Sequence, residues 1–176
     1  MVTIEDLSFE LYISEEKIKG KVEELARKID QHYADKDLSL FVVLNGAFVF
    51  AADLIRHLTL AFNTHFIIYK SYQGEERGEI QVVQNADTTS IKGKNILLIE
   101  DIVDTGQTLD KIIKDLNKHE PISIETASLL IKPECYDFKH PIKFAGFNIE
   151  NKFVVGYGMD YNDKGRNLKS IYKKIE

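Results

Sequence analysis

Hydrophobic positions along this chain form short continuous runs that alternate with longer segments of helical spacing. The runs at 40–44, 66–69 and 96–99 are continuous, which is typical of strands buried on both faces of a parallel sheet. Another strand is predicted over 122–131, and a helical pattern follows the runs at 40–44 and 96–99. This alternation predicts an α/β protein whose mostly parallel sheet is flanked by helices.

The N-terminal part of the chain reads as scaffold. Residues 1–12 alternate loosely and predict an extended arm or a short strand, and Ser14 is a suitable N-cap for a helix that continues to about Tyr33. Short strands are also predicted over 142–147 and 153–155. The residues predicted to form the buried stripe of the helix are Ile18, Val22, Leu25, Ala26 and Ile29.

Composition narrows the class of protein. The chain has 176 residues, of which 44% are hydrophobic, and this predicts one domain over residues 1–176 with a sizeable core. A lone cysteine, Cys135, excludes an internal disulfide and fits a reducing cytosol. No run of 18 apolar residues is present, so we expect a cytoplasmic protein with no membrane partner. A net charge of −5 argues against a broad nucleic-acid surface.

The most informative stretch is NILLIEDIVDTGQT, residues 95–108. Two adjacent carboxylates, Glu100 and Asp101, follow the apolar run, at the strand end where ligands bind in open α/β sheets. Carboxylates there can hold ribose hydroxyls, or a Mg²⁺ that bridges them to phosphate. The next loop leads into a helix whose N-terminal N–H groups suit a phosphate, and Gly106 allows close backbone approach. A plainer interpretation makes Asp104 an N-cap and the two carboxylates ordinary turn residues, but unpaired burial would cost free energy.

Polar residues also follow three other predicted strands. Asn45 and Gly46 come after 40–44, a charged loop bounded by glycines comes after 66–69, and Lys132 ends the strand over 122–131. The loop is a candidate lid over a ligand site. From the residues alone, Asn45 and Gly46 can also be a plain turn, and the charged loop can be a mobile hairpin. Lys132 can be a surface lysine whose ammonium reaches solvent.

The segment LLIEDIVDTGQT resembles the phosphoribosyl pyrophosphate (PRPP) motif of type I phosphoribosyltransferases, and its EDIVDTG form is most similar to the hypoxanthine-guanine branch. The resemblance runs from about Leu40 to Leu168, and the other matching segments follow the family's order. They are LNGAFVF, KSYQGE, ASLLIKP and GFNIENKFVVGYGMDYNDKGRNL. The resemblance implies the type I phosphoribosyltransferase fold, with a small hood built from the N-terminal arm and parts of about 133–176.

The resemblance also implies how PRPP is bound. In the family, the peptide bond corresponding to Leu44–Asn45 can be cis, and lysine or arginine is frequent at the position of Asn45, so asparagine is a departure. The residues implied to bind the ribose and 5′-phosphate are Glu100, Asp101, Asp104, Thr105, Gly106, Gln107 and Thr108. Those implied to bind pyrophosphate are Asn45, Gly46 and Arg166, and those implied to form the flexible lid are Ser71 and Tyr72.

The implied purine site combines a hydrogen-bond donor, an aromatic ring and a base. Lys132 would donate to the purine O6 and so favour a 6-oxopurine, because an ammonium has no acceptor. Phe153 would stack on the ring, although from the residues alone it reads as a core aromatic, and Asp104 would take the proton from N7. The residues implied to bind purine are Lys132, Phe153, Val154 and Asp160, and those implied to hold the cofactor Mg²⁺ are Glu100, Asp101 and Asp160.

The implied reaction is transfer of a phosphoribosyl group from PRPP to hypoxanthine or guanine, in a homodimer or homotetramer without a nucleic-acid partner. Preference among hypoxanthine, guanine and xanthine stays open. An alternative from another class is a PRPP-sensing regulator that binds nucleic acid or protein with the same fold. The acidic net charge and the lack of an appended helix-turn-helix segment count against it.

Overall fold

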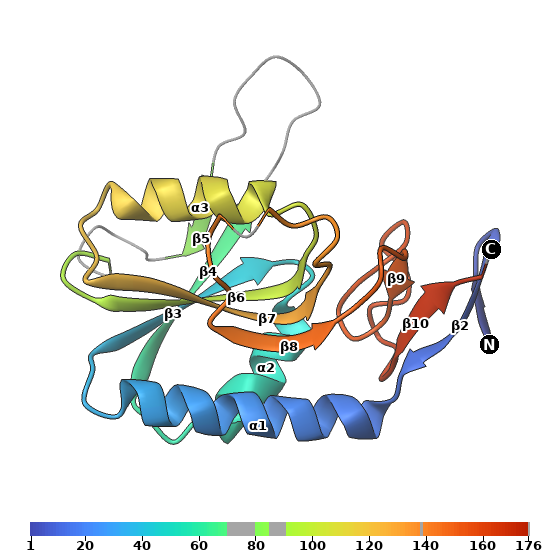
Figure 1. The fold of residues 1–176 in the computed structure, drawn as a ribbon, viewed down its shortest axis with the longest axis horizontal. Coiled ribbons are helices and arrows are strands. Elements are labelled where there is room, and N and C mark those ends of the chain that lie inside the picture. Colours follow the sequence, from blue (N-terminus) through green and yellow to red (C-terminus); the bar gives the residue numbers. More distant parts are fainter. Residues whose placement is uncertain (70–79, 85–90, 138, 176) are drawn as a thin grey trace, which may run out of the picture.

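The computed structural model describes residues 1–69, 80–84, 91–137 and 139–175. In chain order the elements are β1 (Val2–Ile4), β2 (Leu7–Ile13), α1 (Glu15–Tyr33), β3 (Leu38–Leu44), α2 (Phe48–His57), β4 (Phe62–Tyr69), β5 (Ile80–Gln84), β6 (Asn95–Val103), α3 (Gln107–Asn117), β7 (Ser123–Ile131), β8 (Phe144–Asn148), β9 (Val154–Val155) and β10 (Ile171–Lys174) (Figure 1). Within the described ranges, none of the helices combines the length and apolar character that crossing a bilayer requires.

The main sheet has six strands in the order β5-β4-β3-β6-β7-β8. Strands β4, β3, β6, β7 and β8 pair in parallel, and β5 is antiparallel to β4 at one edge. The chain builds outward from β3 to β4 and from β6 to β7 and β8, so the strand order reverses between β3 and β6. Ligands bind at such a switch point in open α/β sheets. The predicted fold class is confirmed.

Helices cover both faces of this sheet, with α1 and α2 on one face and α3 on the other (Figure 1). The predicted N-cap of α1 is confirmed, because the Ser14 hydroxyl accepts a hydrogen bond from the Lys17 N–H. All the residues of its predicted apolar stripe are buried, together with Tyr33. Hydrophobic clusters on both faces of the sheet bury its strands against these helices.

A small antiparallel sheet lies at one end of the molecule and joins both chain termini, in the order β1-β2-β10-β9 (Figure 1). Its core holds Ile4, Phe9 and Val155. The carboxyl ends of the parallel strands point toward this small sheet, which we call the hood. The 171–175 segment, predicted as a strand or short helix, is a strand that links β2 to β9.

One boundary differs from the prediction in a way that matters for the site. The apolar run predicted a strand over 96–99 with two carboxylates after it, whereas β6 continues to Val103 and contains both. In the described ladders, β3 pairs with β6 only as far as Ile99, while β7 continues to pair as far as Val103. The last residues of β6 therefore extend past the described ladder with β3. Over this stretch the described ladder is the one with β7, and the edge that faces β3 borders the switch point.

Candidate active site

A cleft of about 520 Å³ opens at the carboxyl ends of β3 and β6. It lies where the strand order reverses, as the topology requires for an open α/β sheet. The predicted ligand residues that line it are Asn45, Gly46, Asp101, Asp104, Lys132, Phe153, Val154, Asp160 and Arg166. The structure therefore brings together residues that lie up to 121 positions apart in the chain, and Leu44, Ile68, Ile102 and Met159 complete the walls.

A second hollow, of about 100 Å³, lies beside the cleft and is lined by Glu100 and residues 102–109. Ile102 and Asp104 line both spaces, so the two lie side by side. Neighbouring side chains on a strand point to opposite faces, and this separates Glu100, in the hollow, from Asp101, in the cleft. From the sequence, Glu100 and Asp101 were interpreted as one pair of carboxylates. Their side chains point in opposite directions because β6 extends through both residues.

The loop before α3 is built to accept an anion. Gly106 is the N-cap of α3 with φ of 78°, a conformation that suits glycine, and no side chain caps the helix. The Gln107 N–H lies 3.5 Å from the Thr105 hydroxyl. The N-terminus of α3, with the positive end of the helix dipole, therefore borders the smaller hollow.

The loop between β3 and α2 packs closely against two other parts of the site. The Leu44–Asn45 peptide bond is cis. A Cβ at Gly46 would lie 1.9 Å from Asp101 Oδ2, and a Cβ at Gly158 would lie 2.2 Å from the Gly46 carbonyl oxygen. At Gly158 the obstacle is backbone and φ is 101°, so only glycine fits, whereas a side chain at position 46 would displace the Asp101 carboxylate. Gly158 was not singled out from the sequence, although two glycines so close together are a general signal for a turn.

Lys132 forms an ion pair with Asp104 inside the cleft, with its Nζ 2.6 Å from Asp104 Oδ2. The lysine residue is only 7% exposed, so the alternative of a snorkelling surface lysine is wrong. A buried ammonium requires a paired acceptor. The predicted O6 donor and the predicted proton acceptor are thus partners, one at the end of β7 and the other after β6.

The predicted purine wall comes from the hood. Phe153 is 45% exposed and lines the cleft, so it is not a core aromatic. Tyr161 meets it edge-on at 6.0 Å between ring centroids. Asp160 and Arg166 pair at 2.9 Å, and the Arg166 Nη1 also donates to the Gly158 carbonyl at 2.9 Å. The guanidinium is therefore held at the cleft wall in a fixed orientation.

The carboxylates fit a Mg²⁺ shared with a ligand. Mg²⁺ prefers oxygen ligands, keeps several waters and binds through one or two carboxylates plus substrate phosphates. Asp101 and Asp160 both line the cleft. Among the described residues no group of at least three His, Cys, Asp or Glu side chains could hold a metal on its own. Glu100, Asp101 and Asp160 therefore do not form a single cage.

Burial leaves the two carboxyl groups on β6 short of compensating charge. It raises the pKa of Glu100 well above its usual range, and the neighbouring Asp101 adds to that effect. It also raises the pKa of Asp101 to about 6, although backbone N–H groups of Ile102 and Asp101 and the Arg166 guanidinium lower it. A cation or hydroxyl donors in the cleft would offset this cost.

Asp101→Asn should stabilise the ligand-free protein at pH 7.5, by roughly 1–3 kcal/mol. Because the folded-state pKa exceeds the unfolded value, the folded state binds the proton more tightly, and the charged form costs stability above about pH 6. This cost fades as pH falls toward 4, so the advantage of the variant should shrink by pH 5. Urea unfolding at each pH measures it.

The control for this experiment is Asp115→Asn, which removes an exposed carboxylate paired with Lys118 on α3. Its free energy of unfolding should differ from that of the wild type by an amount that does not grow between pH 5 and 7.5. An Asp101→Asn difference that stays constant over this range would contradict the raised pKa.

Ser71 and Tyr72, the predicted lid, fall outside the described residues. Sequence reasoning missed Tyr157, whose hydroxyl donates to Asp53 Oδ2 at 2.6 Å and ties the purine wall to α2. It also missed Tyr136, which packs against Gly106. In both cases the partners are far apart in the chain, so no local spacing could have marked the contact.

Comparison with known proteins agrees with this geometry. A model of the phosphoribosyl transferase domain family matches residues 12–162. Hypoxanthine phosphoribosyltransferase of Escherichia coli (strain K12) is 37% identical over 170 residues, covering 94% of this chain and 95% of that protein. Hypoxanthine-guanine phosphoribosyltransferase of Dictyostelium discoideum is 41% identical over 169 residues, covering 92% of this chain and 93% of that protein.

A solved structure shares the whole fold. The crystal structure of a hypoxanthine-guanine phosphoribosyltransferase from Bacillus anthracis superposes with a TM-score of 0.85 at 34% identity, covering 97% of this chain and 98% of that chain. Family match, sequence identity and fold agree over almost the full length. The chain belongs to the phosphoribosyltransferase family, in its hypoxanthine-guanine branch.

Proposed function

We propose that this protein is a purine salvage enzyme that transfers the 5-phosphoribosyl group of PRPP to hypoxanthine or guanine, releasing pyrophosphate and the nucleoside 5′-monophosphate. The observation that carries the proposal is that two spaces share a wall, one with the buried Lys132 paired to Asp104 and the other at a helix N-terminus. A molecule with a phosphate at one end and a leaving group at the other suits this arrangement.

The 5′-phosphate of PRPP occupies the smaller hollow, where residues 105–108 present N–H and hydroxyl donors. The pyrophosphate lies in the cleft near Gly46 and Arg166. The ribose then spans the two spaces beside Ile102, with Glu100 on one side and Asp101 on the other. This placement gives each carboxylate its own ribose hydroxyl to accept from, which supports the implied roles of both.

The purine lies against Phe153 with its O6 toward Lys132. Asp104 is within reach of the same lysine, so a base whose O6 accepts from the ammonium brings its N7 side close to the carboxylate. Asp104 accepts the N7 proton as the purine nitrogen attacks the ribose carbon. Lys132, freed in part from Asp104, donates to O6 and orients the ring.

Mg²⁺ bound with PRPP supplies positive charge that neutralises the departing pyrophosphate. In this chain Asp101 and Asp160 would hold it, while Arg166 contacts the pyrophosphate directly. The hood closes the cleft on the side of Phe153 and limits the access of water, which would otherwise hydrolyse PRPP.

The direct test is pyrophosphate release with PRPP and Mg²⁺ in the presence of hypoxanthine, guanine, xanthine or adenine. We expect turnover with hypoxanthine or guanine and none with adenine. Lys132→Met should lower kcat/KM for hypoxanthine by about 10²-fold, because the O6 contact is lost. The matched control is Lys118→Met, since Lys118 is an exposed lysine that also pairs with an aspartate.

Each other outcome has a definite meaning. Turnover with adenine would contradict the role of Lys132. If the protein binds PRPP but turns over none of the four bases, the PRPP-sensing regulator would be favoured. Turnover with xanthine would widen the base range without changing the reaction, and relatives named for hypoxanthine alone and for hypoxanthine and guanine leave that range open.

We also propose a homodimer or homotetramer located in the cytosol. The single thiol of the chain supports a reducing compartment.

A further inference from the structure

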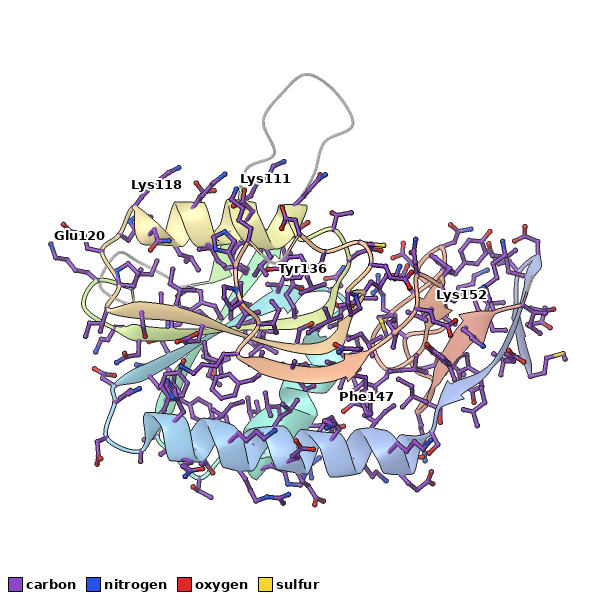
Figure 2. All side chains as sticks on the ribbon, viewed as in Figure 1. Lys111, Lys118, Glu120, Tyr136, Phe147 and Lys152 are labelled. Carbon is purple, nitrogen blue, oxygen red and sulfur yellow. The ribbon has the colours of Figure 1, made fainter. Side chains whose placement is uncertain are left out.

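Tyr136 packs its ring against the glycine of the phosphate loop. The residue is only 4% exposed. A Cβ at Gly106 would lie 2.3 Å from Tyr136 Cε2 and 2.5 Å from its Cδ2. The ring therefore fills the space that a side chain at position 106 would need. Tyr136 lies on the α3 side of the central sheet, as Figure 2 shows.

The hydroxyl of Tyr136 fastens this ring to α3 through His140. It donates to the His140 carbonyl and accepts from the His140 N–H at 3.2 Å. The His140 Nε2 lies 2.9 Å from Asp110 Oδ1, in the first turn of α3. The Asp110 N–H in turn donates to the Gly106 carbonyl at 2.9 Å. These contacts close a loop that begins and ends at Gly106.

Cations neutralise the one acidic residue of that first turn. Lys114 and Lys139 lie 2.6 Å and 2.9 Å from the Asp110 carboxylate. Together with His140 they hold the pKa of Asp110 well below its usual range, Lys114 contributing most. A bare carboxylate here would repel a phosphate at the helix N-terminus. The network thus anchors Tyr136 while leaving the helix end suited to an anion.

The same segment also carries the base-binding lysine. The N–H groups of Cys135 and Tyr136 both donate to the Lys132 carbonyl, at 3.0 and 3.1 Å. Lys132 contacts Asp104 at one end of the phosphate loop, and Tyr136 contacts Gly106 two residues further on. One turn of chain after β7 therefore supports the loop at two points.

We propose that Tyr136 is a positioning residue that holds the 5′-phosphate loop in its binding geometry. It does not line either space of the site, so it acts through Gly106 and the start of α3. The inference rests on the proposed function, because the 5′-phosphate of PRPP is the occupant expected at this loop.

The test compares Tyr136→Leu, Tyr136→Phe and the wild type in steady-state kinetics with hypoxanthine. Tyr136→Leu removes the flat ring and should raise KM for PRPP by about 10-fold, since small displacements of binding groups are costly. KM for hypoxanthine should change by less than about 2-fold. Tyr136→Phe keeps the ring and should restore KM for PRPP to within about 3-fold of wild type.

A matched control separates positioning from general loss of stability. Tyr33 is a fully buried tyrosine, the last residue of α1, and it lines neither space of the site. Tyr33→Leu should lower stability to a similar degree and leave KM for PRPP unchanged. Amide hydrogen exchange at 104–110 should be faster in Tyr136→Leu and unchanged in Tyr33→Leu. If Tyr136→Leu does not fold, Tyr136→Met, which also lacks the flat ring, takes its place with the same expectation.

The failures are distinguishable. A wild-type protein that neither binds PRPP nor turns over would overturn the proposed function. If the wild-type protein turns over hypoxanthine and Tyr136→Leu has an unchanged KM for PRPP, the positioning role alone would be overturned. An equal rise of KM in the Tyr33→Leu control would also overturn it, because the effect would then follow stability.

Discussion

Asp104→Asn should lower turnover by roughly 10²-fold or more while PRPP still binds. An amide cannot take up the N7 proton, and it offers Lys132 a neutral partner in place of the carboxylate that lies 2.6 Å away. The shape of the loop is otherwise kept. Single-turnover kinetics with hypoxanthine, together with PRPP titration by calorimetry, measure the two effects separately.

Asp115→Asn is the matched control, because it also removes a lysine-paired carboxylate, at the far end of α3 from the phosphate loop. Its turnover should equal that of the wild type. Near-normal turnover of Asp104→Asn would remove Asp104 from the role of base. An equal loss of PRPP affinity and turnover would make Asp104 a ligand-binding group instead.

Gly46→Ala should abolish most activity, lowering kcat/KM for PRPP by about 10²-fold, with a far smaller effect on folding. The added Cβ would meet the Asp101 carboxylate at 1.9 Å. The carboxylate is the end of a side chain, so it can rotate away, and the backbone need not move. Rotation takes it from the place where it would meet the ribose and Mg²⁺. Kinetics and thermal unfolding of the same samples measure both effects.

Two further variants test this explanation of the Gly46→Ala effect. Gly20→Ala, in α1, adds a Cβ with no neighbour within 4 Å and should be neutral in activity and stabilising by about 0.5–1 kcal/mol. In an Asp101→Ala background, Gly46→Ala should have little further effect, because the group that it displaces is gone. Additive losses would show that Gly46 acts through its own backbone and not through Asp101.

The hydrophobic pattern was sufficient to predict the main helices and strands and the α/β fold class. Continuous apolar runs marked β3 and β6 because strands covered on both faces can carry no polar stripe. Ser14 and the stripe after it marked α1 because capping and helical spacing are local properties. The match of the 95–108 motif also identified the family, which the comparisons confirm.

The end of β6 was not predictable in this way. Glu100 and Asp101 are polar, so the apolar run appeared to stop before them. The strand continues because β7 pairs with it through Val103, a contact between residues 28 positions apart. This pairing, rather than any local preference, directs one carboxylate into the hollow and the other into the cleft.

What the sequence determined by itself was therefore the order of elements, the family and the kinds of residue in the site, because periodicity, capping and motif spacing are local. Only the tertiary structure decided the Lys132–Asp104 pair, the closeness of Gly46 to Asp101 and Gly158, and the support of Gly106 by Tyr136. Each of these contacts joins segments that meet only when the sheet and the hood have packed. Their distances depend on that packing, which the residue types along the chain do not specify one by one.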